Sequence, residues 1–205
     1  MPETTLTKGE QTREQILDAA LSLFLQQGYN GTSMRQIAAE AGIALGGIYN
    51  HFPSKEELFR QVFLRQHPYQ GTLPAILAAD GQSPEELVRD LADRMLAALR
   101  ERPGFLKLML IEIVEFQSVH MSEVFNIVFP AAFQVIQRLV AEHPGLIRPI
   151  PPAVILRTFI GLFFSYYITE LTLRSAPDWE ANFPQDAINQ FVDIYLYGIL
   201  TGEKA

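Results

Sequence analysis

The chain has 205 residues, of which 48% are hydrophobic, and its formal net charge is −7 at pH 7. It contains no cysteine, which excludes disulfides, thiolate catalysis and cysteine-ligated metals. The hydrophobic content excludes a disordered or low-complexity chain. The acidic balance argues against a broadly basic surface for nucleic acid, although the charge of one face can differ from the total.

Neither an export signal nor a membrane span is apparent in the sequence. The N-terminus is polar and lacks the apolar core of a signal peptide. The longest apolar stretch, residues 159–168, is shorter than the roughly 18 residues that cross a bilayer. We therefore expect a cytoplasmic protein without a membrane partner.

Helical periodicity dominates the chain, and no strand pattern or internal repeat is visible. Capping boxes and stop residues predict about nine helices in an all-α fold. Pro130 is expected to kink or break the helix that contains it. The predicted helices span residues 12–27, 33–42, 45–52, 54–67, 83–102, 105–116, 122–142, 153–173 and 185–200.

Residues 32–55 have the pattern of a helix-turn-helix: a short capped helix, a glycine turn and a second short helix. Gly42 suits the tight reversal of the chain. The inner positions, which should pack on the first helix, are Ile37, Ala38, Ile43 and Ile48. The outer positions are Leu45, Gly46, Tyr49, Asn50 and His51.

This segment resembles the tetracycline-repressor (TetR) family of one-component regulators over about residues 12–60. The matching positions are Thr32, Ile37, Ala38, Ala41, Gly42, Ile43, Gly46, Ile48, Tyr49, His51, Phe52, Ser54, Lys55 and Leu58. The resemblance implies a three-helix DNA-binding domain followed by a larger helical domain for ligand binding and dimerisation. We place the boundary between them after residue 53, giving domains 1–53 and 54–205.

The physical properties of these residues suggest roles at double-stranded DNA. Lys55, at the first turn of its helix, can clamp a phosphate together with free backbone amides. Leu45 can contact a thymine methyl group, and Ala44 lacks the hydroxyl cap that the family often has. Tyr49 has an alternative role as a half-buried core residue, and Asn50 can be solvent-facing filler. The complete predicted DNA-binding set is Ser33, Arg35, Leu45, Gly46, Gly47, Tyr49, Asn50, His51 and Lys55.

The last two predicted helices carry more apolar surface than one chain needs, which predicts a two-fold homodimer built from four helices. Gly161 and Gly198 would allow close crossings. The residues predicted to form the interface are Ile155, Phe159, Leu162, Tyr166, Ile188, Phe191, Tyr195 and Ile199.

Many aromatic residues in the C-terminal part predict a site for a small apolar or aromatic effector that releases the DNA. Each ring taken singly can equally be core. The predicted ligand-binding residues are Phe105, Met109, Glu112, Phe116, His120, Phe125, Phe129, Phe133, Phe163 and Tyr167. The resulting hypothesis is a ligand-responsive repressor that binds a palindromic operator.

Three alternatives stay open: a plain three-helix bundle, a DNA-binding regulator without a ligand, and a helical-bundle enzyme. The sequence has no nucleophile motif, phosphate loop or zinc motif, so we expect no enzyme activity and no cofactor. Glu112, Glu115 and His120 hint at metal spacing, but the paired Glu-x-x-His motifs of a di-iron bundle are missing, so no metal site is expected.

Overall fold

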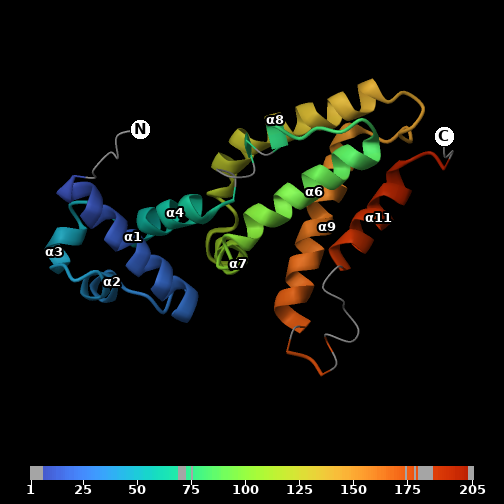
Figure 1. Ribbon diagram of the computed structural model, residues 1–205. Helices are drawn as coiled ribbons and strands as arrows, with labels where there is room; N and C mark the ends of the chain where they lie inside the picture. Colours follow the sequence, from blue (N-terminus) through green and yellow to red (C-terminus); the bar gives the residue numbers. More distant parts are fainter. Residues whose placement is uncertain are drawn as a thin grey trace. The chain divides into compact units, whose positions relative to one another are not determined.

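The computed structural model describes residues 7–68, 73–74, 76–173, 175–177, 179 and 187–202. Over these residues the chain forms nine labelled helices and no strand beyond a single bridge between Ile147 and Leu200, which confirms the predicted all-α fold (Figure 1).

The chain forms two compact units, and each is described here by itself. Unit 1 comprises Met1–His67 and Arg102–Glu123, and unit 2 comprises Pro68–Glu101 and Val124–Ala205. Unit 1 contains α1 (Lys8–Gln27), α2 (Met34–Glu40), α3 (Leu45–Ile48), α4 (Lys55–Gln66), α7 (Phe105–Phe116) and the first residues of α8 (Met121–Glu142). Unit 2 contains α6 (Pro84–Arg100), the rest of α8, α9 (Pro152–Leu173) and α11 (Ala187–Ile199). By packing, α4 and α7 therefore belong with the N-terminal helices, while the functional boundary after residue 53 stays a prediction.

The first helix begins earlier than expected. Thr7, not Thr12, is the N-cap, and a capping box with Glu10 satisfies two backbone N–H groups at the start of α1. Thr12 lies inside the helix, where its hydroxyl donates to the Lys8 carbonyl. A second capping box, of Ser33 with Gln36, is present at the start of α2.

In unit 1, α1 packs on α2, α4 and α7 around one apolar core. The side chains of Ile16, Phe24, Ile37, Phe59 and Phe63 are almost fully buried there. Burying a large apolar side chain stabilises a fold by about 1.5–3 kcal/mol, so these residues hold the short helices α2 and α3 in place.

Helix α7 is buried along one side only, although its sequence is largely apolar. Phe105, Leu108 and Glu112 are buried along one side of α7, while Ile113 and Val114 are exposed. Within unit 1, α7 packs on α1 and α4 with a single face.

Pro130 does not break its helix, because α8 runs through it from Met121 to Glu142. A proline inside a helix removes one backbone hydrogen bond. Burial of Val124 on one side of Pro130 and of Ala132 and Val135 on the other offsets that loss.

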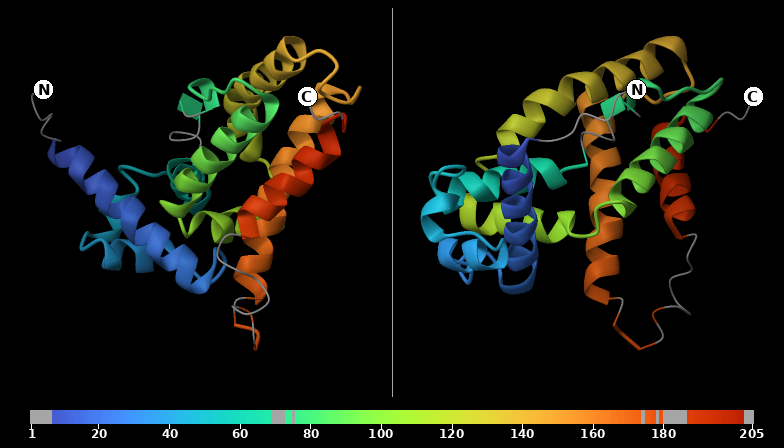
Figure 2. Two further views of the ribbon diagram at one scale, coloured as in Figure 1. Left: turned by 45° about the vertical axis from the view of Figure 1, so that its right-hand side comes forward. Right: turned by 60° about the vertical axis from the view of Figure 1, so that its left-hand side comes forward.

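In unit 2, α11 lies beside α9 and α6 (Figures 1 and 2). This packing corrects the predicted dimer residues. Five of them point into the unit's own core and cannot contact a partner: Ile155, Phe159, Ile188, Tyr195 and Ile199. The other three are partly buried against the same core: Leu162, Tyr166 and Phe191. The error is one of helix face, since both helices carry apolar residues on more than one side.

Two of the described helices are long and apolar enough to cross a membrane by length and composition alone, namely α8 and the segment Pro152–Glu170 of α9. The longest apolar run in the sequence, residues 159–168, does not reveal this property because it is shorter than either helix. The same test is passed by core helices of soluble proteins, and in unit 2 both helices contribute buried residues to a shared core.

The carboxyl end of α4 contains a histidine in an apolar setting. The ring of His67 packs against the rings of Phe63 and Phe105, with centroids 5.9 and 4.7 Å away. Arg102 donates to the backbone carbonyls of Arg65 and His67. Burial, and secondarily the positive charge of Arg102, lower the pKa of His67 to about 4.

This pKa predicts a loss of stability in acid. Between pH 6.5 and 4 the unfolded chain binds a proton at residue 67 that folded unit 1 does not, so stability falls as pH is lowered through this range. We expect a loss of roughly 2 kcal/mol, since one pKa unit corresponds to about 1.4 kcal/mol and partial exposure reduces the full effect. His67→Phe keeps a ring in place and cannot titrate. The free energy of opening of α4, from native-state hydrogen exchange, should therefore fall less steeply in the variant. Parallel pH profiles would contradict the assignment.

Candidate nucleic-acid interface

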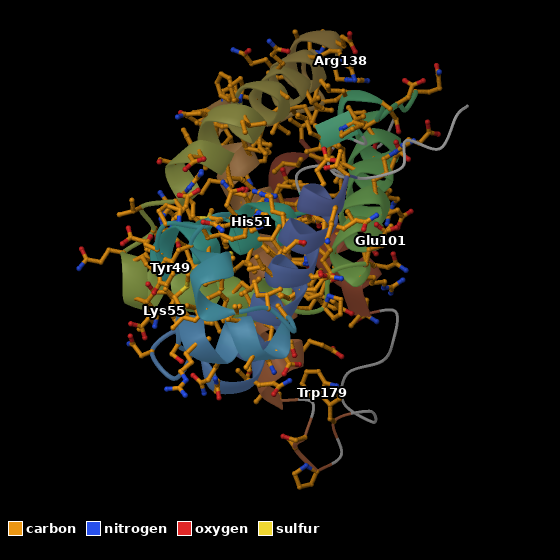
Figure 3. The ribbon with its side chains drawn as sticks, turned by 90° about the vertical axis from the view of Figure 1, so that its left-hand side faces the viewer. Tyr49, His51, Lys55, Glu101, Arg138 and Trp179 are labelled. Carbon is orange, nitrogen blue, oxygen red and sulfur yellow. The ribbon has the colours of Figure 1, made fainter. Side chains whose placement is uncertain are left out.

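The short helix α3 is fixed from one side and open on the other. Ile48 is fully buried and anchors it, whereas Tyr49 is 51% exposed and Leu45 43% exposed. A Cβ atom added at Gly46 or Gly47 would meet nothing within 4 Å, so this side of α3 admits close approach by another molecule. Figure 3 shows Tyr49, His51 and Lys55 near one another, around α3 and the start of α4.

The turn between α2 and α3 depends on Gly42. Its φ is +68°, in the left-handed region, where another residue costs roughly 1–2 kcal/mol. The amides of Gly42 and Ile43 donate to the carbonyls of Ala39 and Ala38. This closed turn sets the direction in which α3 leaves α2. As expected from the sequence, Ala44 gives α3 no side-chain cap.

The polar residues at the start of α2 differ in availability. The hydroxyl of Ser33 accepts from the Gln36 amide and donates to the Gln36 side chain at 2.7 Å, so its predicted phosphate contact has to share this oxygen. Arg35 is exposed and forms no ion pair within the described part of the chain. Asn50 is exposed, and His51 is half-buried.

Lys55 has an intramolecular role that the sequence did not predict. Its Nζ donates to the backbone carbonyls of Tyr29 at 2.9 Å and Thr32 at 2.8 Å, and lies 4.0 Å from the centroid of the Tyr29 ring. Burial lowers its pKa. An ammonium group has three N–H donors, so one remains after these two bonds. Lys55 therefore ties the start of α4 to the α1–α2 loop, and only its remaining donor is available to a phosphate.

Four acidic residues of unit 1 are paired with arginines of α4. Arg65 pairs with Glu14 at 2.6 Å and with Asp18, and Arg60 pairs with Glu57 and Glu123. The hydrogen bond from Arg60 lowers the pKa of Glu57 to about 2. Local pairing thus reduces the repulsion that the net charge of −7 would exert on DNA.

The predicted ligand residues fall into both units. In unit 1, Phe105 is buried, Met109 is partly buried, and Phe116 stacks on Phe59. Glu112 and His120, which were predicted to contact a ligand, bond to each other.

In unit 2, Phe125, Phe129 and Phe133 form a stacked ladder along α8, with successive centroids 4.4 and 5.6 Å apart. Phe163 is buried in the core. The hydroxyl oxygen of Tyr167 is buried without a hydrogen-bond partner among the described residues, and burial raises its pKa to about 12. Among the same residues, no group of three or more His, Asp or Glu side chains is placed to hold a metal ion.

The sequence analysis missed the residues of the α1–α2 loop. Tyr29 and Thr32 hold Lys55, and Asn30 donates to Glu115 of α7 at 2.7 Å. The one feature of the sequence that could have indicated this contact is an aromatic residue, Tyr29, directly after Gly28 at the end of the first helix.

Comparisons with known proteins agree with this geometry. The profile of the family described as "Bacterial regulatory proteins, tetR family" matches residues 16–62. The "HTH-type transcriptional regulator SrpR" of Pseudomonas putida is 41% identical over 71 residues, which are 34% of this chain and 33% of that protein. The "HTH-type transcriptional regulator AcrR" of Shigella flexneri is 44% identical over 63 residues, 31% of this chain and 29% of that protein. The aligned region thus spans about a third of each relative.

Solved structures share the whole fold at lower identity. NalD of Pseudomonas aeruginosa has a TM-score of 0.67 and 23% identity, covering 96% of this chain and 100% of that one. A putative TetR-family regulator from Mesorhizobium loti has a TM-score of 0.67 and 24% identity, with the same coverage. The helix-turn-helix of this chain is thus similar to that of the tetR family of bacterial regulatory proteins, and its fold is shared with these solved structures.

Proposed function

We propose that the protein is a cytoplasmic transcriptional repressor that binds a palindromic operator as a homodimer and releases it when a small, mostly apolar effector binds unit 2. The observation that carries the proposal is the exposed face of α3, anchored by Ile48 and set by the Gly42 turn, within the segment matched by the family profile.

The names of relatives support regulation, and repression in particular. SrpR and AcrR are named as transcriptional regulators, and NalD is described as the secondary repressor of a multidrug efflux pump. An Escherichia coli relative, 33% identical over 66 residues, is named as a probable operon repressor. These names favour a regulator over the helical-bundle enzyme.

A revised dimer face follows from burial in unit 2. Ile160 and Phe164 of α9 are exposed and lie one helical turn apart. On α11, the side chains of Ile194 and Tyr197 are 71% and 78% exposed. Gly161 and Gly198 lie beside them, and a Cβ added at either would meet nothing within 4 Å. A second copy of the same face would cover these side chains in an isologous four-helix contact.

The effector proposal is supported by the unpaired hydroxyl of Tyr167. Buried polar atoms nearly always have a hydrogen-bond partner, so an oxygen that has none among the described residues marks a place for a polar ligand atom. An effector that fits would be apolar over most of its surface and carry one hydrogen-bonding group. A ligand-independent repressor is the alternative.

Substitution of Arg35 and of Lys55 should affect operator binding in different ways. Arg35→Ala removes one exposed cation from each chain and should weaken binding to all DNA sequences alike, lowering the salt slope by about one per chain, or about two for the dimer, without changing the melting temperature. Lys55→Ala should weaken binding and also destabilise unit 1, since it breaks two hydrogen bonds worth about 1 kcal/mol each. Tyr49→Ala should reduce affinity while the dimer persists. DNA from the region upstream of the gene, and DNA selected from random sequence, are the probes for titration.

The same variants also provide the outcomes that would contradict this prediction. Equal melting temperatures for Lys55→Ala and the wild type would contradict the structural role of Lys55. Unchanged DNA affinity in both Arg35→Ala and Tyr49→Ala would contradict the proposed orientation of α3.

Dimerisation can be tested on the revised face. Tyr197→Glu combined with Phe164→Glu should raise the dissociation constant of the dimer about 100-fold, because two charges would be buried against apolar surface. Sedimentation at micromolar concentration measures the shift to monomer. Val114→Glu changes an equally exposed apolar residue of α7 in unit 1 and should leave the dimer intact. A wild-type monomer, or a dimer that both sets of changes leave intact, would refute this face.

Two tyrosine-to-phenylalanine changes should act in opposite directions. Tyr167→Phe deletes a hydroxyl without a partner and should leave the ligand-free protein as stable as the wild type or more so. Tyr195→Phe deletes the bond to the Ile155 carbonyl, 3.0 Å long, and should cost about 1 kcal/mol. A lipophilic compound that raises the wild-type melting temperature and releases DNA should do so less with Tyr167→Phe. A loss of stability in Tyr167→Phe equal to that in Tyr195→Phe would show that its hydroxyl is paired.

A further inference from the structure

A buried acid–histidine pair lies in unit 1, outside the proposed DNA-binding face. Glu112 of α7 is 0% exposed and His120 is 5% exposed. The backbone N–H of His120 donates to Oε1 of Glu112 at 2.7 Å, and Nδ1 of its ring lies 2.8 Å from Oε2. Both carboxylate oxygens are thus used by one residue, eight positions further along the chain.

This pair closes the turn between α7 and α8. Gln117 and Ser118 have φ angles of 51° and 65°, a conformation that residues other than glycine seldom adopt. The backbone carbonyl of Glu112 accepts from the Ser118 amide at 3.1 Å, while its carboxylate accepts from His120. One residue therefore holds both sides of an unfavourable turn.

On one side, the turn is attached to the structure around Lys55. The ring of Phe116 stacks on Phe59 of α4 and meets the ring of Tyr29 edge-on, with both centroid distances 4.7 Å. The adjacent Glu115 accepts from Asn30. Tyr29 supplies the carbonyl and the ring that hold Lys55.

On the other side, the turn leads into α8. Glu123, in the first turn of that helix, accepts two hydrogen bonds from Arg60 of α4, of 2.8 and 3.0 Å. The helix then continues past residue 123 into unit 2. The Glu112–His120 pair therefore lies where the chain passes from unit 1 into unit 2.

We propose that the Glu112–His120 pair is a latch that couples the start of α8 to the α1–α2 loop and Lys55, so that a displacement of α8 in unit 2 changes the geometry of the DNA-binding helices. The latch rests on the proposed DNA-binding function and gives it a route of regulation. Its residues are positioning residues, since neither lies on α3 or at the start of α4. Breaking the pair frees the turn, and Phe116 and Glu123 then lose their common support.

Two variants of the full-length protein separate coupling from stability. Replacing a buried, hydrogen-bonded polar pair by apolar residues of similar volume often preserves folding, so Glu112→Leu combined with His120→Leu removes the latch while filling its space. Glu112→Gln is the matched control. Its amide accepts from the His120 backbone and donates to Nδ1 of the other imidazole tautomer, which keeps both hydrogen bonds without the carboxylate.

The readout is hydrogen exchange of residues 124–142, the part of α8 in unit 2, with and without operator DNA selected by the wild-type protein from random sequence. In the wild type and in Glu112→Gln, bound operator should slow exchange in this segment by about tenfold. The double variant should bind the operator within about threefold of the wild-type affinity and lose the slowing. If the pair had a structural role only, its removal would change the melting temperature but not the slowing of exchange that operator binding causes.

Three outcomes would overturn the latch: equal slowing in the double variant and the wild type, no slowing in the wild type when its operator is bound, or loss of slowing in Glu112→Gln despite normal affinity. If the double variant fails to fold, Arg60→Gln tests the outer connection to Glu123, and slowing unchanged from the wild type would overturn the proposal equally. A wild-type protein that selects no DNA would instead refute the proposed function itself.

Discussion

The ring of Phe59 is the contact on which unit 1 depends. It is fully buried in α4 and lies within 4.7–6.3 Å, centroid to centroid, of the rings of Phe24, Tyr29, Phe63, Phe116 and His120. These residues come from α1, the α1–α2 loop, α4, α7 and the turn before α8. Aromatic pairs add about 0.5–1.5 kcal/mol each beyond the burial of their area, so α4 is held from several directions at once.

The net charge of the chain is negative, and DNA is itself an anion. Local ion pairing explains how such a chain can still bind DNA. Arginines of α4 neutralise acids of α1, α4 and α8, so fewer unpaired carboxylates repel an approaching phosphate. The cost is that few free cations remain on the α3 side, because Lys55 is also bound within the unit. With so few free cations per chain, the proposed DNA binding would draw its affinity from two chains binding together, so the proposed dimer would be part of DNA binding rather than an addition to it.

Local patterns in the sequence predicted the helices, the Gly42 turn and the exposed face of α3, because these depend on neighbours a few residues apart. Contacts between distant residues were not predictable in the same way. Nothing near Lys55 in the sequence indicates that carbonyls 26 and 23 positions earlier will bind its ammonium group. The pairing of Glu112 with His120 was likewise missed: both were taken for ligand contacts, since an isolated polar group in an apolar helix looks unpaired until the fold supplies its partner.

The dimer residues show why periodicity alone selects the wrong face. Along α9, Ile155, Phe159 and Phe163 form a regular apolar stripe, but Ile160 and Phe164 form a second one, and only one of the two can face the chain's own core. The first stripe packs on α11, which leaves the second exposed with open glycine positions beside it. The same surplus of apolar residues makes α9 resemble a membrane helix in composition. We attribute these surplus apolar residues to contact with a second copy of the chain rather than with a bilayer. The neighbouring helix α11 also has exposed apolar residues, Ile194 and Tyr197, but carries polar residues at other positions. A face shared by two helices fits a four-helix contact.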